Sequence, residues 1–283
     1  MNTKHSLPTV TVVTPTIGRD ALQRAMKSVV ACAAPDLIVE HLIVVDGPNF
    51  ENKVRLIAES VPNTDQYQAH LLMMPFNTYR SGAICRAIGS TLARGEYVAY
   101  LDDDNWFLPE HLSNCVRTMN DHPKLGWLHT SRYIHCDDDT WNQKDAVEDL
   151  CQSLGLYHHE WVTPVQHFVD TNCYFLRRTV CLNGASNWHL NSIADAWGED
   201  RIFFSWLVNN APRHAFLFKP TVVYVADATG QAFIKEGNER IGAKTSKRKN
   251  QLITFNGSLT FPIKSWLCRS LMQLHQRRLS TTQ

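Results

Sequence analysis

Long apolar runs are missing from this chain of 283 residues. No stretch of about 18 uncharged apolar residues occurs, so we expect no helix that spans a bilayer. The first ten residues, MNTKHSLPTV, contain neither an apolar segment nor a cleavage site, and we expect no export by a signal peptide. The eight cysteines include no CxxC pair, which is typical of free thiols in a reducing cytoplasm rather than of a disulfide framework.

Two common nucleotide-binding fingerprints are also absent. The glycines at positions 82, 89 and 95 form neither a P-loop nor a GxGxxG pattern, which argues against an NTPase and against a dehydrogenase. With 44% hydrophobic and 19% charged residues, the composition is that of a globular protein and excludes disordered, fibrous and membrane-embedded classes. The length fits one large domain or two small ones.

Charge is unevenly distributed along the chain. The formal net charge is +1, yet residues 235–283 contain ten Lys and Arg against two Glu, a net +8, which leaves −7 on the first 234 residues. Within this basic tail, apolar residues recur at helical spacing from Ile263 to Leu274. Two interpretations stay open: a helix docked on the acidic body, or an interfacial helix resting on the inner face of an anionic membrane.

Apolar, β-branched runs alternate with helical patterns in the first part of the chain. This alternation predicts an α/β fold with a parallel sheet and right-handed crossovers, and ligands of such sheets bind at the carboxyl ends of the strands. Strands are expected at 9–14, 41–45, 69–74 and 96–101, and helices near 22–30, 54–61 and 84–92. Further along, 173–180 predicts a strand and 195–208 predicts a loop that leads into a helix.

An acidic triplet, Asp102, Asp103 and Asp104, follows the fourth predicted strand. In an extended segment its first and third carboxylates project to the same side, and a cation between them removes their repulsion. Ligands that are all oxygen suit Mg²⁺ or Mn²⁺. The alternative is a solvated acidic turn. A second triplet, residues 137–139, follows no such strand and is interpreted as an exposed loop.

Five segments together resemble family 2 glycosyltransferases, which are inverting enzymes of the GT-A fold. They are PTVTVVTPTIGR, HLIVVDGPN, YRSGAICRAIGSTLARGEYVAYLDDDNWFLPEHL, CYFLRR and WGEDRIFF, and they cover about residues 8–210 in the family's order. The resemblance implies a mostly parallel central sheet flanked by helices. We expect a catalytic domain at 1–226, with a nucleotide-binding half at 8–120 and an acceptor half at 121–226, followed by a basic extension at 227–283.

The resemblance also implies roles for individual residues. Asp104 would hold a divalent ion, Mn²⁺ or Mg²⁺, on the donor diphosphate. Asp200 would be the general base beside Glu199, although acids also stabilise the first turn of a helix without any catalytic role. Contacts with the nucleotide-sugar are implied for Thr14, Pro15, Thr16, Arg19, Asp46 (the base edge), Arg80, Gly82, Arg86, Asp102 (near the ribose) and Asp103.

Candidate sugar or acceptor contacts come from the second half of the chain. Trp197 adjoins the expected base and could stack on a sugar ring. His167, Asp170 and Asn172 precede the strand expected at 173–180 and could contact donor or acceptor.

The sequence also departs from the family's pattern. Gly47 stands where many members carry a second acid, and Asn105 replaces the second acid after the triplet. No histidine after Asp200 sits in a convincing metal-ligand motif.

Together with the resemblance, these residues predict a metal-assisted transfer, with inversion, of a sugar from a nucleotide-diphosphate sugar, which we expect to be a uridine diphosphate sugar. The resemblance alone implies that the acceptor is a hydroxyl of a glycan or glycolipid. No nucleic-acid partner is expected. One alternative is a non-catalytic nucleotide- or glycan-binding protein of the same fold, against which the intact Asp104 and Asp200 speak. Another is a sugar nucleotidyltransferase, which needs a glycine-rich basic loop after the first strand, and TPTIGRDAL lacks one.

Overall fold

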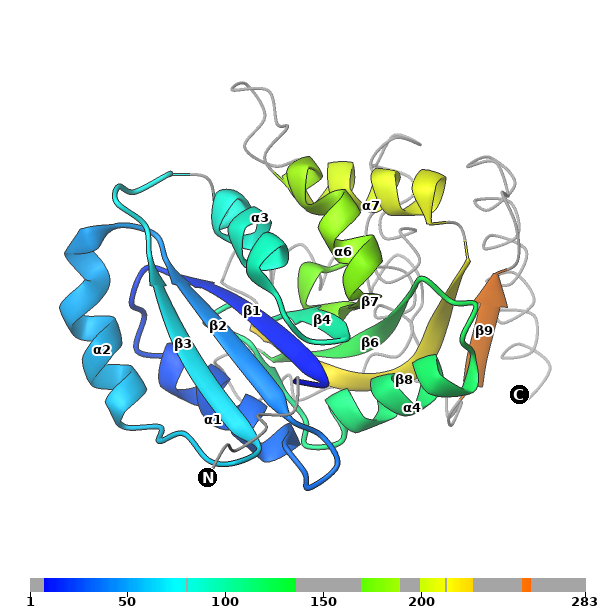
Figure 1. Ribbon diagram of the computed structural model, residues 1–283, viewed down its shortest axis with the longest axis horizontal. Helices are drawn as coiled ribbons and strands as arrows, with labels where there is room; N and C mark the ends of the chain where they lie inside the picture. The colour runs from blue at the N-terminus through cyan, green and yellow to red at the C-terminus, as the bar shows by residue number, and fades with distance from the viewer. Residues whose placement is uncertain are drawn as a thin grey trace, which may run out of the picture.

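A computed structural model describes residues 8–79, 81–135, 169–188, 199–211, 213–225 and 251–255. Its described strands form one nine-stranded sheet in the order β3-β2-β1-β4-β7-β6-β8-β5, with β9 paired to β8 (Figure 1). The strands are β1 (Val10–Thr16), β2 (Val39–Val45), β3 (Tyr67–Met73), β4 (Tyr97–Tyr100), β5 (Trp106–Phe107), β6 (Trp127–His135), β7 (Tyr174–Arg177), β8 (His214–Val225) and β9 (Gln251–Phe255).

The first four strands form the parallel half of this sheet. β1 pairs in parallel with β2 and β4, and β2 pairs in parallel with β3. Every residue of β1, β2 and β4 is buried, because helices cover the sheet, and the polar side chains Thr11, Glu40 and His41 in these strands are hydrogen-bonded. The crossovers are α1 (Leu22–Cys32), α2 (Glu51–Glu59) and α3 (Ala83–Leu92). The predicted order of strands and helices is confirmed here, as is the α/β fold class.

The second half of the sheet is mixed. β7 is antiparallel to both β4 and β6, whereas β6 and β8 are parallel. The strand predicted at 173–180 is shorter than expected, because its ladder with β4 ends where Arg177 pairs with Tyr97, the first residue of that strand. The chain turns there into α6 (Arg178–Gly184). The helix predicted after the loop at 195–208 is α7 (Glu199–Asn210).

Helices lie on both sides of the sheet. Figure 1 shows α3, α6 and α7 on one side, with α1 and α4 (His111–Asp121) on the other. Short 3₁₀ turns follow β2 at η1 (Pro48–Phe50), precede β7 at η3 (Thr171–Cys173) and follow α6 at η4 (Ala185–Trp188).

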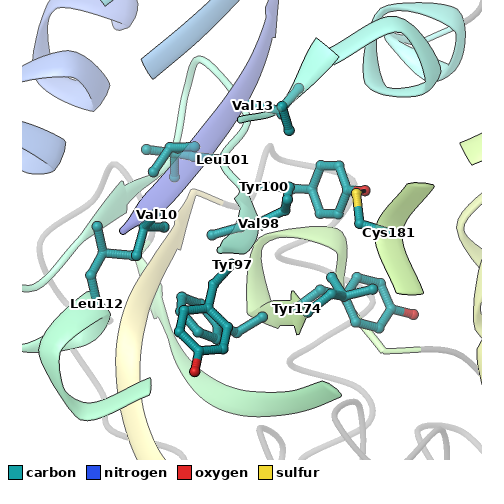
Figure 2. Close-up of a cluster of buried hydrophobic side chains, with 14 of the residues drawn as sticks. Val10, Val13, Tyr97, Val98, Tyr100, Leu101, Leu112, Tyr174 and Cys181 are labelled. Carbon is teal, nitrogen blue, oxygen red and sulfur yellow. Dashed lines mark hydrogen bonds between the residues drawn. The ribbon is translucent and has the colours of Figure 1, made fainter. Parts of the chain in front are cut away.

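A buried aromatic cluster joins these helices to β4. The Tyr100 hydroxyl lies 2.6 Å from Ser90 Oγ on α3 and 3.2 Å from Cys181 Sγ on α6 (Figure 2). Trp188 Nε1 donates to the same hydroxyl at 3.3 Å, and the Trp188 ring stacks on Phe203 of α7 with 4.1 Å between ring centroids. The start of α7 is thereby fixed beside the carboxyl end of β4.

Three further expectations concern the basic extension, the cysteines and membrane-spanning helices. Residues 251–255, inside the expected extension, form β9, while the apolar repeat at 263–274 lies outside the described residues. The five described cysteines are all buried and form no disulfide. Within the described part of the chain, no helix is both long and apolar enough to cross a membrane.

Candidate active site

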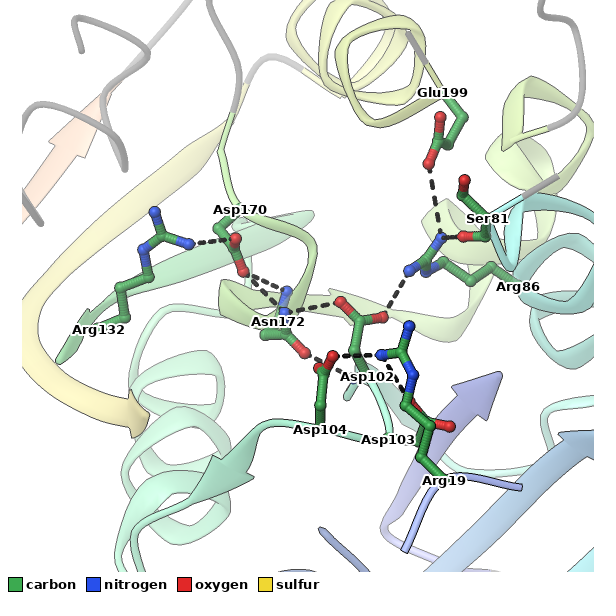
Figure 3. Close-up of polar contacts among 10 residues, drawn as sticks. All are labelled: Arg19, Ser81, Arg86, Asp102, Asp103, Asp104, Arg132, Asp170, Asn172 and Glu199. Carbon is green, nitrogen blue, oxygen red and sulfur yellow. Dashed lines mark hydrogen bonds and ion pairs between the residues drawn. The ribbon is translucent and has the colours of Figure 1, made fainter. Parts of the chain in front are cut away.

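The acidic triplet lies in the loop after β4, where the ends of β1, α3 and η3 meet (Figure 3). Asp103 is buried in this loop and points to the end of β1. Thr16 Oγ1 donates to its Oδ2 at 2.6 Å, and Arg19 Nη1 lies 3.3 Å from its Oδ1. Burial raises the pKa of the Asp103 carboxyl. Asp103 therefore ties the loop after β1 to the loop after β4.

Asp104 is the most accessible acid of the triplet, with 36% of its side chain exposed. Arg19 pairs with its carboxylate, and Arg24 Nη2 donates to its backbone carbonyl at 2.8 Å. The Arg24 guanidinium also lies over the ring of Trp106, 4.0 Å from the centroid. Burial, followed by the negative charge of Asp102, raises the pKa of Asp104 to about 6.

A divalent cation fits the chemistry of this loop. Three neighbouring carboxylates repel one another, and a hard cation on Asp104 would offset that repulsion with the oxygen ligands it prefers. Among the described residues, no group of three or more His, Cys, Asp or Glu converges to hold a metal. Mg²⁺ and Mn²⁺ commonly keep several waters and share substrate phosphates, so a single protein carboxylate is compatible with such a site.

Arg86 joins the acidic loop to the first turn of α7. Its Nη2 lies 2.5 Å from Asp102 Oδ1, and its Nη1 lies 3.8 Å from Glu199 Oε1 and donates to the Ser81 carbonyl at 2.9 Å. Only 7% of the Arg86 side chain is exposed. Asp200, the next residue of α7, is close enough that its charge, after burial, raises the pKa of Tyr174. Two acid motifs about a hundred residues apart in the sequence thus share one arginine.

The end of β2 contributes a second buried acid. Asp46 accepts hydrogen bonds from the Thr78 amide at 2.8 Å and from Thr78 Oγ1 at 3.0 Å. Gly47 follows with φ +123°, and a Cβ there would lie 3.1 Å from Asn77 Cβ. A side chain at position 47 would be strained and crowded, which explains why glycine stands where many family members carry an acid.

Two residues at the end of β1 have mainly internal partners. Thr14 Oγ1 lies 2.8 Å from His41 Nε2 of the neighbouring strand β2, and both side chains are buried. Pro15 packs on Gly82, where an added Cβ would lie 2.8 Å from the proline Cβ. Both residues are therefore buried against other parts of the protein at the edge of the sheet where the site is predicted.

Asn172 and Asn105 also face the protein. The Asn172 amide is fully buried between Asp102 and Asp170, a placement that favours a role inside the protein over the predicted sugar contact. Asn105 Oδ1 accepts from the Val225 amide at 2.8 Å, so an amide rather than an acid holds the end of β8 against the acidic loop. Arg80, His167, Trp197 and the triplet at 137–139 lie outside the described residues.

Three side chains around the site were not singled out by the sequence: Arg24, Thr78 and Arg132. Arg132 is buried in β6 and pairs with Asp170. Arg132 is the only Lys, Arg, Asp or Glu of the stretch WLHTSRYI at 127–134, and in a buried strand it indicates a carboxylate partner, because an unpaired buried charge is costly. Nothing comparable marks Arg24 or Thr78 in the sequence.

A sequence profile of the family described as Glycosyl transferase family 2 matches residues 11–181. The match covers more than half of the chain. This chain belongs to glycosyl transferase family 2. It is accordingly a glycosyltransferase, as the sequence predicted.

Solved structures show the same fold. S. aureus TarS 1–349 in complex with UDP-GlcNAc superposes with a TM-score of 0.58 at 16% identity, covering 84% of this glycosyltransferase and 68% of that chain. The mannosyltransferase PcManGT from Pyrobaculum calidifontis, in complex with GDP-Man and Mn²⁺, gives 0.53 at 17% identity, covering 84% and 62%. A longer structure of S. aureus TarS gives 0.52 at 15% identity, and this chain spans 40% of it. The GT-A-type fold is thereby confirmed.

Proposed function

We propose that this glycosyltransferase moves a sugar from a nucleotide-diphosphate sugar to a hydroxyl of a glycan or glycolipid acceptor, with inversion at the anomeric carbon. The observation that supports the proposal best is the position of Arg86 between two acid motifs, 2.5 Å from Asp102 and 3.8 Å from Glu199. A donor-side loop and a candidate base are therefore adjacent, as a direct displacement between donor and acceptor needs.

On the donor side, the departing diphosphate needs positive charge. Arg19 and Arg86 supply guanidinium groups beside the acidic loop. Asp104 would hold a Mn²⁺ or Mg²⁺ ion, which when bound would polarise the diphosphate as a Lewis acid. The proposed nucleobase is uracil, to be read at Asp46, and it is supported by the likeness to TarS, whose complex contains UDP-GlcNAc. The GDP-Man complex of PcManGT makes guanine the alternative to test.

On the acceptor side, Asp200 is assigned as the general base. Glu199 already faces Arg86 at 3.8 Å, and Asp200 is the other acid of the first turn of α7. A carboxylate there would take the proton of the acceptor hydroxyl as that oxygen attacks the anomeric carbon opposite the diphosphate. One displacement with one base inverts the configuration.

The same proposal assigns parts of the chain to donor and acceptor. Residues 8–120 would bind the nucleotide and 121–226 the acceptor, and the basic stretch 227–283 would contact an anionic membrane beside a lipid-linked acceptor. This last assignment rests on the net +8 of residues 235–283 and on the apolar repeat within them.

A thermal-shift panel tests the proposed function directly. UDP, GDP and ADP are each added with and without Mn²⁺. Hydrolysis of the corresponding nucleotide-sugars is then measured through the nucleoside diphosphate that it releases. We expect UDP with Mn²⁺ to raise the melting temperature most, since a ligand at 100 times its Kd adds about 2.7 kcal/mol of stability. If no nucleoside diphosphate raised the melting temperature, the proposal would fail. Binding without hydrolysis or transfer of any sugar would favour the non-catalytic alternative.

A further inference from the structure

A chain of polar side chains runs through the protein from β6 to α7 by way of the acidic loop (Figure 3). Each member contacts the next by a hydrogen bond or an ion pair. In order, they are Arg132, Asp170, Asn172, Asp102, Arg86 and Glu199.

In the middle of this chain of polar side chains, Asn172 both donates and accepts hydrogen bonds. Asn172 Oδ1 accepts from the Asp102 backbone amide at 2.6 Å. Its Nδ2 donates to Asp102 Oδ2 at 3.0 Å and to Asp170 Oδ1 at 2.9 Å. The two N–H groups of one amide thus hold two carboxylates, and the amide oxygen holds a backbone N–H. An aspartate in this position would have no donor for either carboxylate.

Asp102 is fixed from both sides as a result. Asn172 holds its Oδ2, while Arg86 holds its Oδ1 at 2.5 Å. Arg86 is almost fully buried, so it needs this carboxylate, and the same guanidinium faces Glu199. A change in the orientation of Asp102 would therefore displace the group that lies next to the acid pair of α7.

The chain of polar side chains ends, on the Arg132 side, in the second half of the sheet. Asp170 pairs with Arg132 of β6, and its Oδ1 accepts a hydrogen bond from the backbone N–H of Asn172 at 2.9 Å. The Arg132 guanidinium lies over the ring of Tyr224 of β8, 4.1 Å from the centroid. Through Asp170, Asn172 is therefore tied to β6 and β8 as well as to Asp102 at the end of β4.

We propose that Asn172 is a positioning residue that holds Asp102, and through it Arg86, in the geometry that donor binding and the α7 acids share. This inference rests on the proposed function and adds to it a residue that would touch neither substrate. Asp170 supports Asn172 from behind. Loss of the Asn172 amide should therefore affect donor binding and turnover together.

The test compares Asn172→Ala and Asn172→Asp with a control in which a different buried carboxylate loses its charge. Glu40→Gln is matched because Glu40 is buried and held by Thr11 Oγ1 at 2.6 Å and Arg94 Nε at 2.5 Å. It lies on β2 five residues before Val45, the last residue of that strand, and so about 17 Å from the strand end where the site begins. Kinetics of UDP-sugar hydrolysis are measured at a temperature at which thermal unfolding shows each variant fully folded.

We expect both Asn172 variants to raise the donor KM and to lower kcat, each by roughly tenfold or more, because hydrogen bonds to a charged group are lost. Asn172→Asp should be the more severe, since it adds a third negative charge between two carboxylates. Glu40→Gln should lower the melting temperature and leave KM unchanged. A wild-type KM in Asn172→Asp, or equal KM changes in the control, would overturn the inference.

Two further measurements test the positioning role of Asn172. If the Asn172 variants do not fold, Asp170→Asn preserves the shape but removes the charge that faces Arg132, and an unchanged donor KM in that variant overturns the inference. The ¹⁵N resonance of the Arg86 side chain, assigned by its absence from the spectrum of Arg86→Lys, reports the ion pair between Arg86 and Asp102 in the protein without any ligand. If the wild type bound no nucleotide, the proposed function would fail, whereas an Arg86 resonance that was the same in wild type and Asn172→Ala would refute the positioning role.

Discussion

Replacing Gly82 with alanine should strain the junction between β1 and α3. Gly82 has φ +79°, and a Cβ there would lie 2.8 Å and 2.9 Å from Cβ and Cγ of Pro15. The left-handed backbone costs alanine about 1–2 kcal/mol, and overpacking against a rigid ring costs about 1–3 kcal/mol. The sum of about 2–5 kcal/mol corresponds to a fall in melting temperature of roughly 3–8 °C for a chain of this size.

The same substitution should also weaken nucleotide binding. The added Cβ would also lie 3.4 Å from Arg86 Nη1, so relief of the clash with Pro15 moves either the proline or the arginine. Calorimetric titration with UDP and Mn²⁺ measures this effect beside thermal unfolding. Gly126→Ala is the control, because that glycine has no left-handed φ and its nearest neighbour would be Val180 Cγ2 at 3.2 Å. A Gly82→Ala protein with the stability and UDP affinity of wild type would refute the reasoning.

Four other predictions concern the acids, a buried histidine and the tail. Asp104→Ala should abolish transfer and any Mn²⁺-dependent gain in UDP affinity, whereas Asp138→Ala should change neither; equal losses would contradict the metal assignment. Asp200→Asn should lower turnover by roughly 10²–10⁴-fold with little change in donor affinity, and near-normal turnover would leave the reaction without its base. Burial lowers the pKa of His41 from 6.5 to about 3. The neutral imidazole therefore contributes fully to the free energy of unfolding above pH 6.5, and this contribution is lost as the pH falls toward 3, by up to about 1.4 kcal/mol per pH unit. Urea unfolding between pH 7 and 4 should show a flatter decline for His41→Gln, and an unchanged slope would exclude this histidine as a cause. A chain ending at Asn256 should sediment less with anionic liposomes than the full chain, and equal sedimentation would refute the membrane contact.

The parallel half of the fold could be predicted because its strands are buried on both faces. Such strands are rich in apolar and β-branched residues, as β1 is with Val10, Val12 and Val13 around Thr11, and that pattern is visible without a structure. The position of Asp102 to Asp104 at the site followed from the same argument, since the carboxyl ends of parallel strands share one edge.

The mixed half could not be predicted in the same way. β8 contains Lys219 and Pro220 in its middle, where the register against β6 also shifts, so its sequence shows no continuous strand pattern. The contacts of Asn172 were hidden for a different reason. Its partner Asp102 is 70 residues away, and local spacing carries no information about which distant carboxylate an amide will meet.

The two long-range ties of the acidic loop have a consequence for a chain that is still being synthesised. Once β4 has left the ribosome, the four parallel strands can pair with one another, and among them only β4 still lacks a partner, β7. The loop after β4 then still lacks Asn172 and also Val225, which is 120 residues beyond its partner Asn105. At about 5–20 residues per second, roughly 6–24 s of translation separate Asn105 from the strand that holds it. A nascent chain therefore completes the parallel strands of its sheet well before its acidic loop is fixed, and a truncated product that ends in this interval would lack the fixed acidic loop.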